Sequence, residues 1–79
     1  MKEKYIVKFY QRFDKKLYSE MAGYIAENQR SYDCFVMTRL ILSAKLHDTY
    51  EDAVKTISWC LNKRIDGEII FKVEKIYLA

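Results

Sequence analysis

The chain has 79 residues, of which 51% are hydrophobic and 15% aromatic, and its formal net charge is +3. This length suits one domain with one small core and excludes a catalytic domain joined to a separate substrate domain. The composition also excludes a disordered chain. Without proline, and with two glycines, the chain contains no recognisable linker, so we expect a single domain over residues 1–79. The mild positive charge permits attraction to nucleic acid or to an acidic protein surface and requires neither.

Residues 4–12 (KYIVKFYQR) predict the first strand. Large apolar side chains alternate there with mostly polar ones, which is typical of a strand with one buried face and one mixed face. The buried face would consist of Tyr5, Val7 and Phe9. The mixed face would carry Lys4, Ile6, Lys8 and Tyr10.

Residues 14–29 allow two interpretations. Asp14 could cap a helix in which apolar residues recur at helical spacing, although Gly23 weakens that helix. The alternative is a strand over residues 23–28 (GYIAEN). We favour the helix. The next segment, residues 32–43, is rich in β-branched and aromatic residues, which predicts a central strand covered on both faces.

Residues 49–64 form the most clearly predicted helix. Asp48 can cap its start and Glu51, three residues later, can complete a capping box. Lys63 and Arg64 near its end complement the helix dipole.

The last element is a strand. A turn at Asp66 and Gly67 ends the helical region, and alternating apolar residues over 68–78 follow it. The expected fold class is therefore α+β: a small, mainly antiparallel sheet with the helix over 49–64 packed on it and, in the favoured interpretation, a second helix over 14–29.

Trp59 is placed by this pattern on the polar side of the helix. At about 100° per residue, the apolar stripe consists of Tyr50, Ala53, Val54, Ile57, Cys60 and Leu61. Trp59 then lies roughly opposite, near Lys55 and Lys63. An indole in that place should be covered by another layer of the chain such as the helix over 14–29, by a twin subunit or by a foreign partner.

The residue types of common active sites are present without their spacing. His47 is the single histidine and has no cluster of donors around it, so we expect neither a metal nor a cofactor. Ser43, His47 and Asp48 lie near one another in sequence, but nearness in sequence is not the spatial geometry of a triad. Cys34 and Cys60 suggest two buried thiols in a reducing cytosol. We therefore expect a cytoplasmic, non-enzymatic protein without a signal peptide or membrane span.

Binding is the function class that is left. Basic and aromatic residues interleave over 8–18 and again at Arg30 and Tyr32, which would suit phosphates and stacked bases. Lysines that protect a sheet edge would give the same pattern. Seven tyrosines and an outward tryptophan also suit a protein interface.

Residues 44–63 (AKLHDTYEDAVKTISWCLNK) resemble a sequence segment found in small proteins of Gram-positive bacteriophages and prophages. In those proteins, as here, a strand similar to KYIVKF precedes the segment and one similar to FKVEKIYL follows it. Residues 13–43 depart from the short hairpin usual in such proteins. The resemblance implies an inhibitor that occupies a surface of a host defence enzyme or a nucleic-acid-handling enzyme, as anti-CRISPR proteins do.

Together these observations predict a small phage-type protein that binds and inhibits a bacterial host protein in the host cytoplasm. The predicted contact surface consists of Trp59, Lys55, Lys63, Tyr10 and Arg12. Two alternatives stay open: a small nucleic-acid-binding accessory protein, and a homodimer in which Trp59 or the last strand is buried against its copy.

Overall fold

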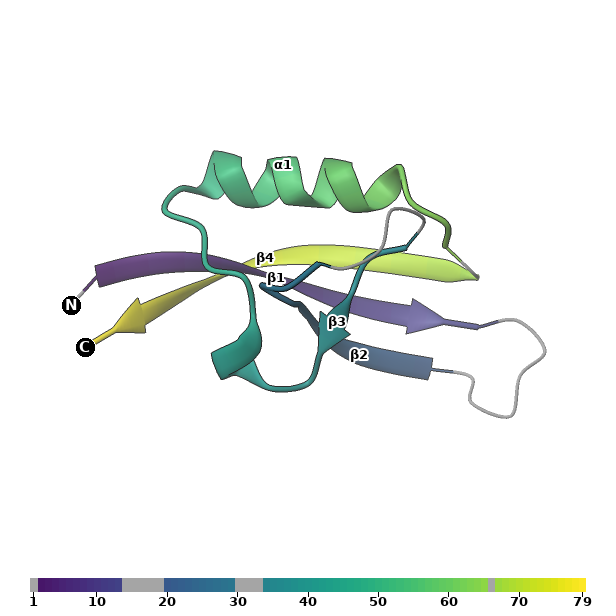
Figure 1. Cartoon of the computed structure of the whole chain (residues 1–79), viewed down its shortest axis with the longest axis horizontal. Coiled ribbons are helices and arrows are strands. Elements are labelled where there is room, and N and C mark those ends of the chain that lie inside the picture. The colour runs from purple at the N-terminus through teal and green to yellow at the C-terminus, as the bar shows by residue number, and fades with distance from the viewer. Residues whose placement is uncertain (1, 14–19, 30–33, 66) are drawn as a thin grey trace.

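One helix lies across one face of an antiparallel sheet (Figure 1). The structure, a computed structural model, describes residues 2–13, 20–29, 34–65 and 67–79. In chain order its elements are β1 (Lys2–Arg12), β2 (Glu20–Ile25), β3 (Met37–Thr38), the short 3-10 helix η1 (Ile41–Ser43), α1 (Tyr50–Leu61) and β4 (Glu68–Leu78). This confirms the predicted α+β class, in one small domain.

The first and last strands lie side by side along their whole length. The strand order in the sheet is β3-β2-β1-β4. β1 pairs antiparallel with β4 from Lys2↔Leu78 to Arg12↔Glu68. On its other side β1 pairs with β2 over the shorter stretch from Lys8↔Tyr24 to Arg12↔Glu20. The predicted strands over 4–12 and 68–78 are therefore confirmed, and β4 forms one edge of the sheet.

The core lies between α1 and the sheet. Its buried members are Val7, Phe9, Ile25, Phe35, Ala53 and Cys60. Phe35 packs edge-on against Phe9 and Phe71, with ring centroids 6.0 and 5.7 Å apart. The helix presents its small residues Ala53 and Cys60 to this cluster, so α1 can approach the strands closely.

The start of α1 shows a cap one residue later than predicted. Thr49 is the N-cap, and its hydroxyl accepts a hydrogen bond from the Asp52 N–H at 3.1 Å. The prediction of Asp48 as the cap, with Glu51 completing the capping box, is therefore wrong. The Asp48 carboxylate instead accepts a hydrogen bond from Lys4 Nζ on β1, which fastens the entry of the helix to the sheet.

The second helix predicted over 14–29 is wrong where the structure describes that segment, because Glu20–Ile25 is strand β2. Residues 14–19 lie outside the described residues. The alternative, a strand over 23–28, identified the type of element, although β2 begins earlier and ends at Ile25. Gly23 explains the outcome: a Cβ there would lie 2.7 Å from the Thr38 carbonyl oxygen and 3.2 Å from the Phe9 ring. Because glycine has no side chain, β1 and β3 can both pack closely against β2 at this position.

The central strand predicted over 32–43 is also wrong. Only Met37–Thr38 form a strand there, and β3 lies at the edge of the sheet. The Thr38 hydroxyl accepts a hydrogen bond from the Leu40 N–H at 3.1 Å, which supports a turn directly after the strand. The apolar residues that follow face solvent, and Leu42 is 97% exposed. Residues 32–33 lie outside the described part of the chain.

Candidate functional site

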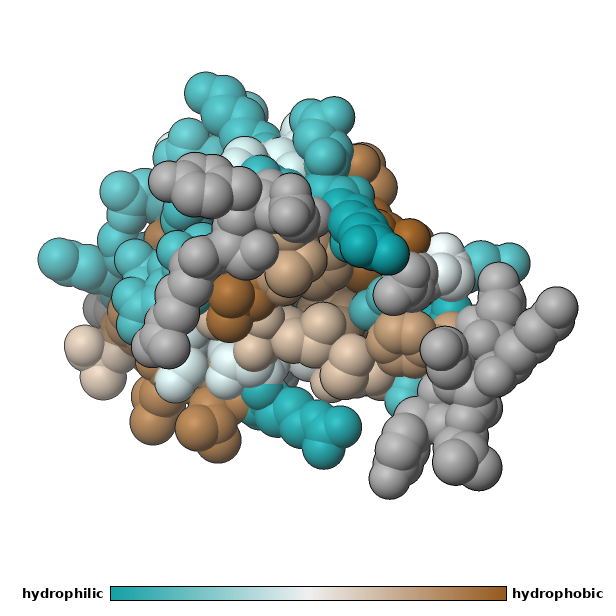
Figure 2. Space-filling view, turned by 45° about the vertical axis from the view of Figure 1, so that its right-hand side comes forward, coloured by the Kyte–Doolittle hydropathy of each residue, from teal (hydrophilic) through white to brown (hydrophobic). Residues whose placement is uncertain are grey.

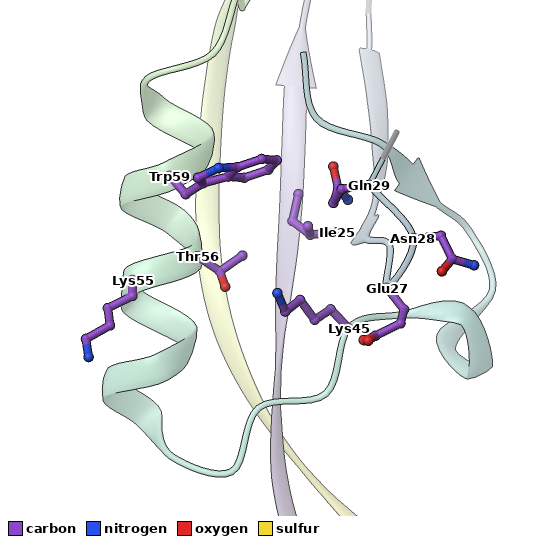
Figure 3. A pocket seen from close by; sticks show the side chains of 8 residues that line it. All are labelled: Ile25, Glu27, Asn28, Gln29, Lys45, Lys55, Thr56 and Trp59. Atoms are coloured by element: carbon purple, nitrogen blue, oxygen red, sulfur yellow. The ribbon is translucent and has the colours of Figure 1, made fainter. Parts of the chain in front are cut away.

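A groove of about 890 Å³ opens between α1 and the segment that follows β2. Lys55, Thr56 and Trp59 of α1 form one wall. The other residues that line it are Ile25, Glu27, Asn28, Gln29 and Lys45. Figure 3 shows the indole of Trp59 reaching from the helix toward the side of the groove where Ile25 and Gln29 lie. An apolar surface and several polar groups therefore meet in one open hollow.

The Gln29 side chain holds the wall opposite the helix. Its Nε2 donates to the carbonyl oxygens of Ala26 and Val36, both at 2.8 Å, and its Oε1 accepts from the Val36 N–H at 2.7 Å. The Ala26 N–H also donates to the Val36 carbonyl at 3.0 Å. The amide thus takes the place of a strand neighbour for Val36. Backbone hydrogen bonds from Glu27 to Ser43 and from Lys45 to Ile25 hold the rest of this wall.

Trp59 lies on the flank of α1 rather than opposite its buried face, which corrects the predicted arrangement. The buried stripe is centred on Ala53 and Cys60, while Tyr50 and Leu61 of the predicted stripe are 55% and 57% exposed. The helix is therefore rotated relative to the prediction, and Trp59 is turned toward the groove. The indole is 37% exposed. Within the described part of the segment that was predicted to cover Trp59 with a helix, Glu20–Ile25 form β2 instead.

The charges around Trp59 are mostly positive. Lys63 Nζ lies 4.3 Å from the centroid of the indole ring, a cation–π contact. Lys45 and Lys55 line the groove, and Glu27 is the acidic residue among its described lining residues. Figure 3 shows the Lys55 side chain directed away from the hollow, so an anionic group that entered the groove would meet Lys45 beside Glu27, with Lys63 over the indole.

Cys60 lies behind this wall as a buried thiol. Burial raises its pKa to about 11, and the nearby charges of Lys45 and Lys63 oppose that rise without cancelling it. A thiol with this pKa is almost entirely protonated at neutral pH and is a poor nucleophile. Cys34, predicted to be buried as well, is exposed, so that part of the prediction is wrong.

Tyr10 and Arg12 lie on the other face of the sheet from α1. Side chains alternate along a strand, and Val7 and Phe9 of β1 belong to the core under the helix. Arg12 is 3.9 Å from a carboxylate oxygen of Glu20, and a hydrogen bond to Glu20 raises the pKa of Tyr10. On the same face Lys8 pairs with Glu74 at 3.4 Å. Of the five predicted binding residues, Trp59, Lys55 and Lys63 therefore lie together, and Tyr10 and Arg12 do not join them.

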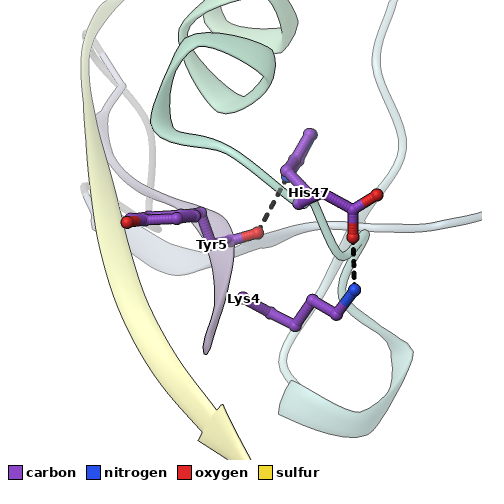
Figure 4. A network of polar contacts seen from close by, with 4 residues as sticks. Lys4, Tyr5 and His47 are labelled. Atoms are coloured by element: carbon purple, nitrogen blue, oxygen red, sulfur yellow. Dashed lines mark hydrogen bonds and ion pairs between the residues drawn. The ribbon is translucent and has the colours of Figure 1, made fainter. Parts of the chain in front are cut away.

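His47 joins β1 to α1 and is 5% exposed. Its Nδ1 donates to the Tyr5 carbonyl at 2.9 Å (Figure 4). Its Nε2 lies 2.7 Å from the Thr56 hydroxyl. Its backbone pairs with Tyr5 in both directions. The histidine thus has a structural part in the fold, since both ring nitrogens are used within the chain.

The contact surface predicted from sequence contained two of the eight residues that line the groove, Lys55 and Trp59. Ile25, Gln29, Lys45 and Thr56 reach it from three separate stretches of the chain, and no spacing pattern relates them. Thr56 could have been found, because it lies one turn before Trp59 on the same side of α1.

Apolar side chains also reach the surface outside the groove, at more than one place in Figure 2. The largest exposed examples beyond α1 are Leu40, Leu42 and Ile70. Within the described ranges no group of three or more His, Cys, Asp or Glu side chains is placed to hold a metal ion. No helix there is long and apolar enough to cross a membrane.

Comparison with known protein families, with curated proteins and with solved structures finds no match for this chain. The groove is therefore interpreted from its own chemistry.

Proposed function

We propose that this protein is a non-enzymatic binding protein that inhibits a bacterial host protein by holding part of that protein's surface in the Trp59 groove. The observation that supports this most is the half-covered indole at the groove wall, with Lys63 against its ring. Tryptophan at the centre of a concave, partly desolvated site is a frequent anchor of protein interfaces.

The groove walls are held before any partner arrives. Lys63, just after the end of α1, contacts the ring, and Gln29 makes three hydrogen bonds in the opposite wall. Binding to a site that is already formed loses less side-chain entropy, so more of the contact energy contributes to affinity.

The lysines indicate the chemistry of the partner. Lys45 lies in the groove, Lys55 lies on its rim and Lys63 lies over the indole, whereas Glu27 is the one carboxylate among the described lining residues. A segment that pairs an apolar or aromatic side chain with neighbouring aspartate or glutamate would complement both the ring and the charges.

The resemblance of residues 44–63 to small phage and prophage proteins supports a bacterial target. Among the targets that this resemblance implies are a CRISPR-type defence enzyme and a nucleic-acid-handling enzyme. An inhibitor of either class acts by covering a surface, which requires no catalytic group of its own.

Affinity capture from a bacterial lysate, followed by titration of the purified partner, tests this function. Trp59 is the chain's one tryptophan, so its fluorescence reports directly on the groove. We expect Trp59→Ala to abolish partner binding and Lys55→Glu to weaken it. Tyr10→Ala and Arg39→Glu, at exposed positions outside the groove lining, serve as matched controls and should bind as the wild type does.

Thermal unfolding followed by circular dichroism shows whether each of these variants loses binding or loses its fold. Trp59→Ala removes a partly buried ring and should lower the melting temperature, so its binding is measured well below that temperature. Lys55 is exposed, and Lys55→Glu should melt as the wild type does. Equal partner binding by the wild type, Trp59→Ala and Lys55→Glu would show that the groove is not the contact surface.

Nucleic-acid binding remains the alternative proposal. On the open face of the sheet, Lys8 and Arg12 each lie close to a glutamate, which lowers the positive potential available to phosphates and favours the protein partner. A gel shift with single-stranded and duplex oligonucleotides at low salt tests the alternative, since such binding weakens steeply as salt rises.

A further inference from the structure

We propose that two copies of this chain pair through the free edges of β4, antiparallel and about a two-fold axis at Val73, to form one continuous sheet. This interaction is separate from the groove. It follows from the exposed edge, from the direction of its backbone groups and from the order of charges along the strand.

The outer edge of β4 is long and open. β4 has 11 residues and lies at the end of the strand order, and no strand or bridge lies on its outer side in the described ranges. Its partner β1 has the same length and contains the buried residues Ile6, Val7, Phe9 and Gln11, whereas no residue of β4 is buried. The register with β1 has no bulge, and the chain has no proline. Two devices that usually protect an edge are thus missing.

The bonding pattern of Tyr5 shows which β4 groups point outward. The Tyr5 N–H and C=O bond with His47, on the side of β1 away from β4. Because backbone groups alternate in direction along a strand, the even-numbered residues of β1 bond with β4. Their register partners in β4 are also even-numbered, from Glu68 to Leu78. The N–H and C=O groups that face outward are therefore those of Ile69, Phe71, Val73, Lys75 and Tyr77.

Centring the pair on Val73 matches both the backbone and the side chains. Val73 then bonds with Val73 of the second copy, and Ile69 faces Tyr77 of the second copy. On the open sheet face, Lys72 lies opposite Glu74 of the second copy, twice by symmetry, and Ile70 lies opposite Ile76 of the second copy. All 11 residues of the strand overlap in this register.

The neighbouring registers are disfavoured by charge. A shift of the centre by one residue keeps the outward backbone groups matched, because odd-numbered residues still face odd-numbered ones. It also places Lys72 against Lys72 of the second copy in one direction, or Glu74 against Glu74 of the second copy in the other. Like charges directly across two strands are destabilising, so the alternation of Lys72 and Glu74 selects the register centred on Val73.

The groove remains open in such a dimer. It lies between α1 and the end of β2, on the side of the helix away from β4 (Figure 3). A two-fold axis perpendicular to the sheet keeps both helices on one face, so the dimer would present two grooves on that face.

Exchanging the charges in two separate variants tests the pairing. Lys72→Glu places two glutamates against two glutamates across the axis, and Glu74→Lys places two lysines against two lysines. Each variant alone should dimerise about tenfold or more weakly than the wild type. An equal mixture restores opposite charges at every position and should form a heterodimer, which sedimentation velocity and native mass spectrometry can detect.

The double variant Lys72→Glu with Glu74→Lys is the matched control. Its charges are again complementary, so it should dimerise as the wild type does. Lys8 lies directly across from position 72 in the sheet, so the introduced glutamate can replace the ion pair between Lys8 and Glu74. Unchanged circular dichroism spectra would show that each variant folds.

Two results would overturn the proposal. One is a wild type that stays monomeric at the highest soluble concentration. The other is self-association of both single variants at wild-type strength, which would place the contact on another surface. Neither result bears on the groove, because partner binding there is measured with Trp59→Ala and Lys55→Glu.

Discussion

Replacing Gln29 with leucine should destabilise the fold and loosen the groove together. The leucine side chain has nearly the same volume but makes none of the three hydrogen bonds that join Gln29 to Ala26 and Val36. The Val36 carbonyl keeps its bond from the Ala26 N–H. The Val36 N–H loses the acceptor that Gln29 supplies.

The expected magnitude follows from these bonds. A hydrogen bond within a protein contributes about 1 kcal/mol net. Three such bonds, partly offset by the apolar contacts of leucine, give a loss of about 2–3 kcal/mol. For a domain of this size each kcal/mol lowers the melting temperature by about 4–8 °C, so we expect a fall of roughly 10–20 °C. That is a large part of a total stability of about 5–15 kcal/mol.

Urea unfolding followed by Trp59 fluorescence measures this effect, because the indole lines the same groove as Gln29. Asn28→Ala, at the exposed neighbouring position, is the control and should change stability by no more than about 0.5 kcal/mol. We call the three hydrogen bonds of Gln29 to Ala26 and Val36 the clamp. If Gln29→Leu unfolds at the same urea concentration as Asn28→Ala, the clamp does not stabilise the fold.

Gln29→Glu adds a test with a defined sign. The new carboxylate keeps an acceptor for the Val36 N–H but faces two carbonyl oxygens, which disfavour its charged form and raise its pKa in the folded state. A carboxyl whose pKa is higher in the folded than in the unfolded state stabilises the fold as it becomes protonated. The free energy of unfolding of Gln29→Glu should therefore approach that of the wild type as the pH falls. A difference from the wild type that is constant with pH would contradict the clamp geometry.

Three further predictions concern other parts of the fold. His47→Ala removes ring bonds to Tyr5 and Thr56 from a buried site and should lower the free energy of unfolding by about 2–4 kcal/mol in urea; an unchanged midpoint would exclude that role. Gly67→Ala puts a Cβ 2.1 Å from the carbonyl oxygen of Arg12 at φ 75°, so the melting temperature should fall clearly, and an equal melt would rule out this strain. Iodoacetamide under native conditions should modify exposed Cys34 and spare Cys60, whose pKa is raised to about 11; mass spectrometry showing equal labelling would refute this.

β1, α1 and β4 were predictable because the spacing of apolar residues in each one matches the face that it buries. In β1 and β4 every second residue faces the core, and in α1 the small residues Ala53 and Cys60 recur where the helix meets the sheet. β2 was not predictable in the same way. Its apolar residues fit a helical spacing as well as a strand, and the choice depends on the close approach that Gly23 permits between Phe9 and Thr38.

The candidate site was predictable only as far as a single element reaches. Trp59, Lys55 and Lys63 lie on or just after α1, so their spacing in sequence brought them together. Tyr10 and Arg12 were assigned to the same surface although strand alternation places them on the face away from Phe9. The opposite wall of the groove includes hydrogen bonds between Gln29 and Val36, which are seven residues apart in sequence and are related by no sequence pattern.

The clamp links the stability of the domain to its proposed binding function. Gln29 fixes Val36, and the neighbouring Phe35 packs between Phe9 and Phe71 in the core. The segment that forms the groove wall therefore also supplies a central core ring. Substitutions in the clamp should weaken partner binding in proportion to the stability they remove, whereas Lys55→Glu should weaken binding with no loss of stability. At about 1 kcal/mol for each lost bond, a clamp variant should lose about 2–3 kcal/mol of stability. If such a variant still binds the partner at full strength, this wall of the groove is not part of the binding site.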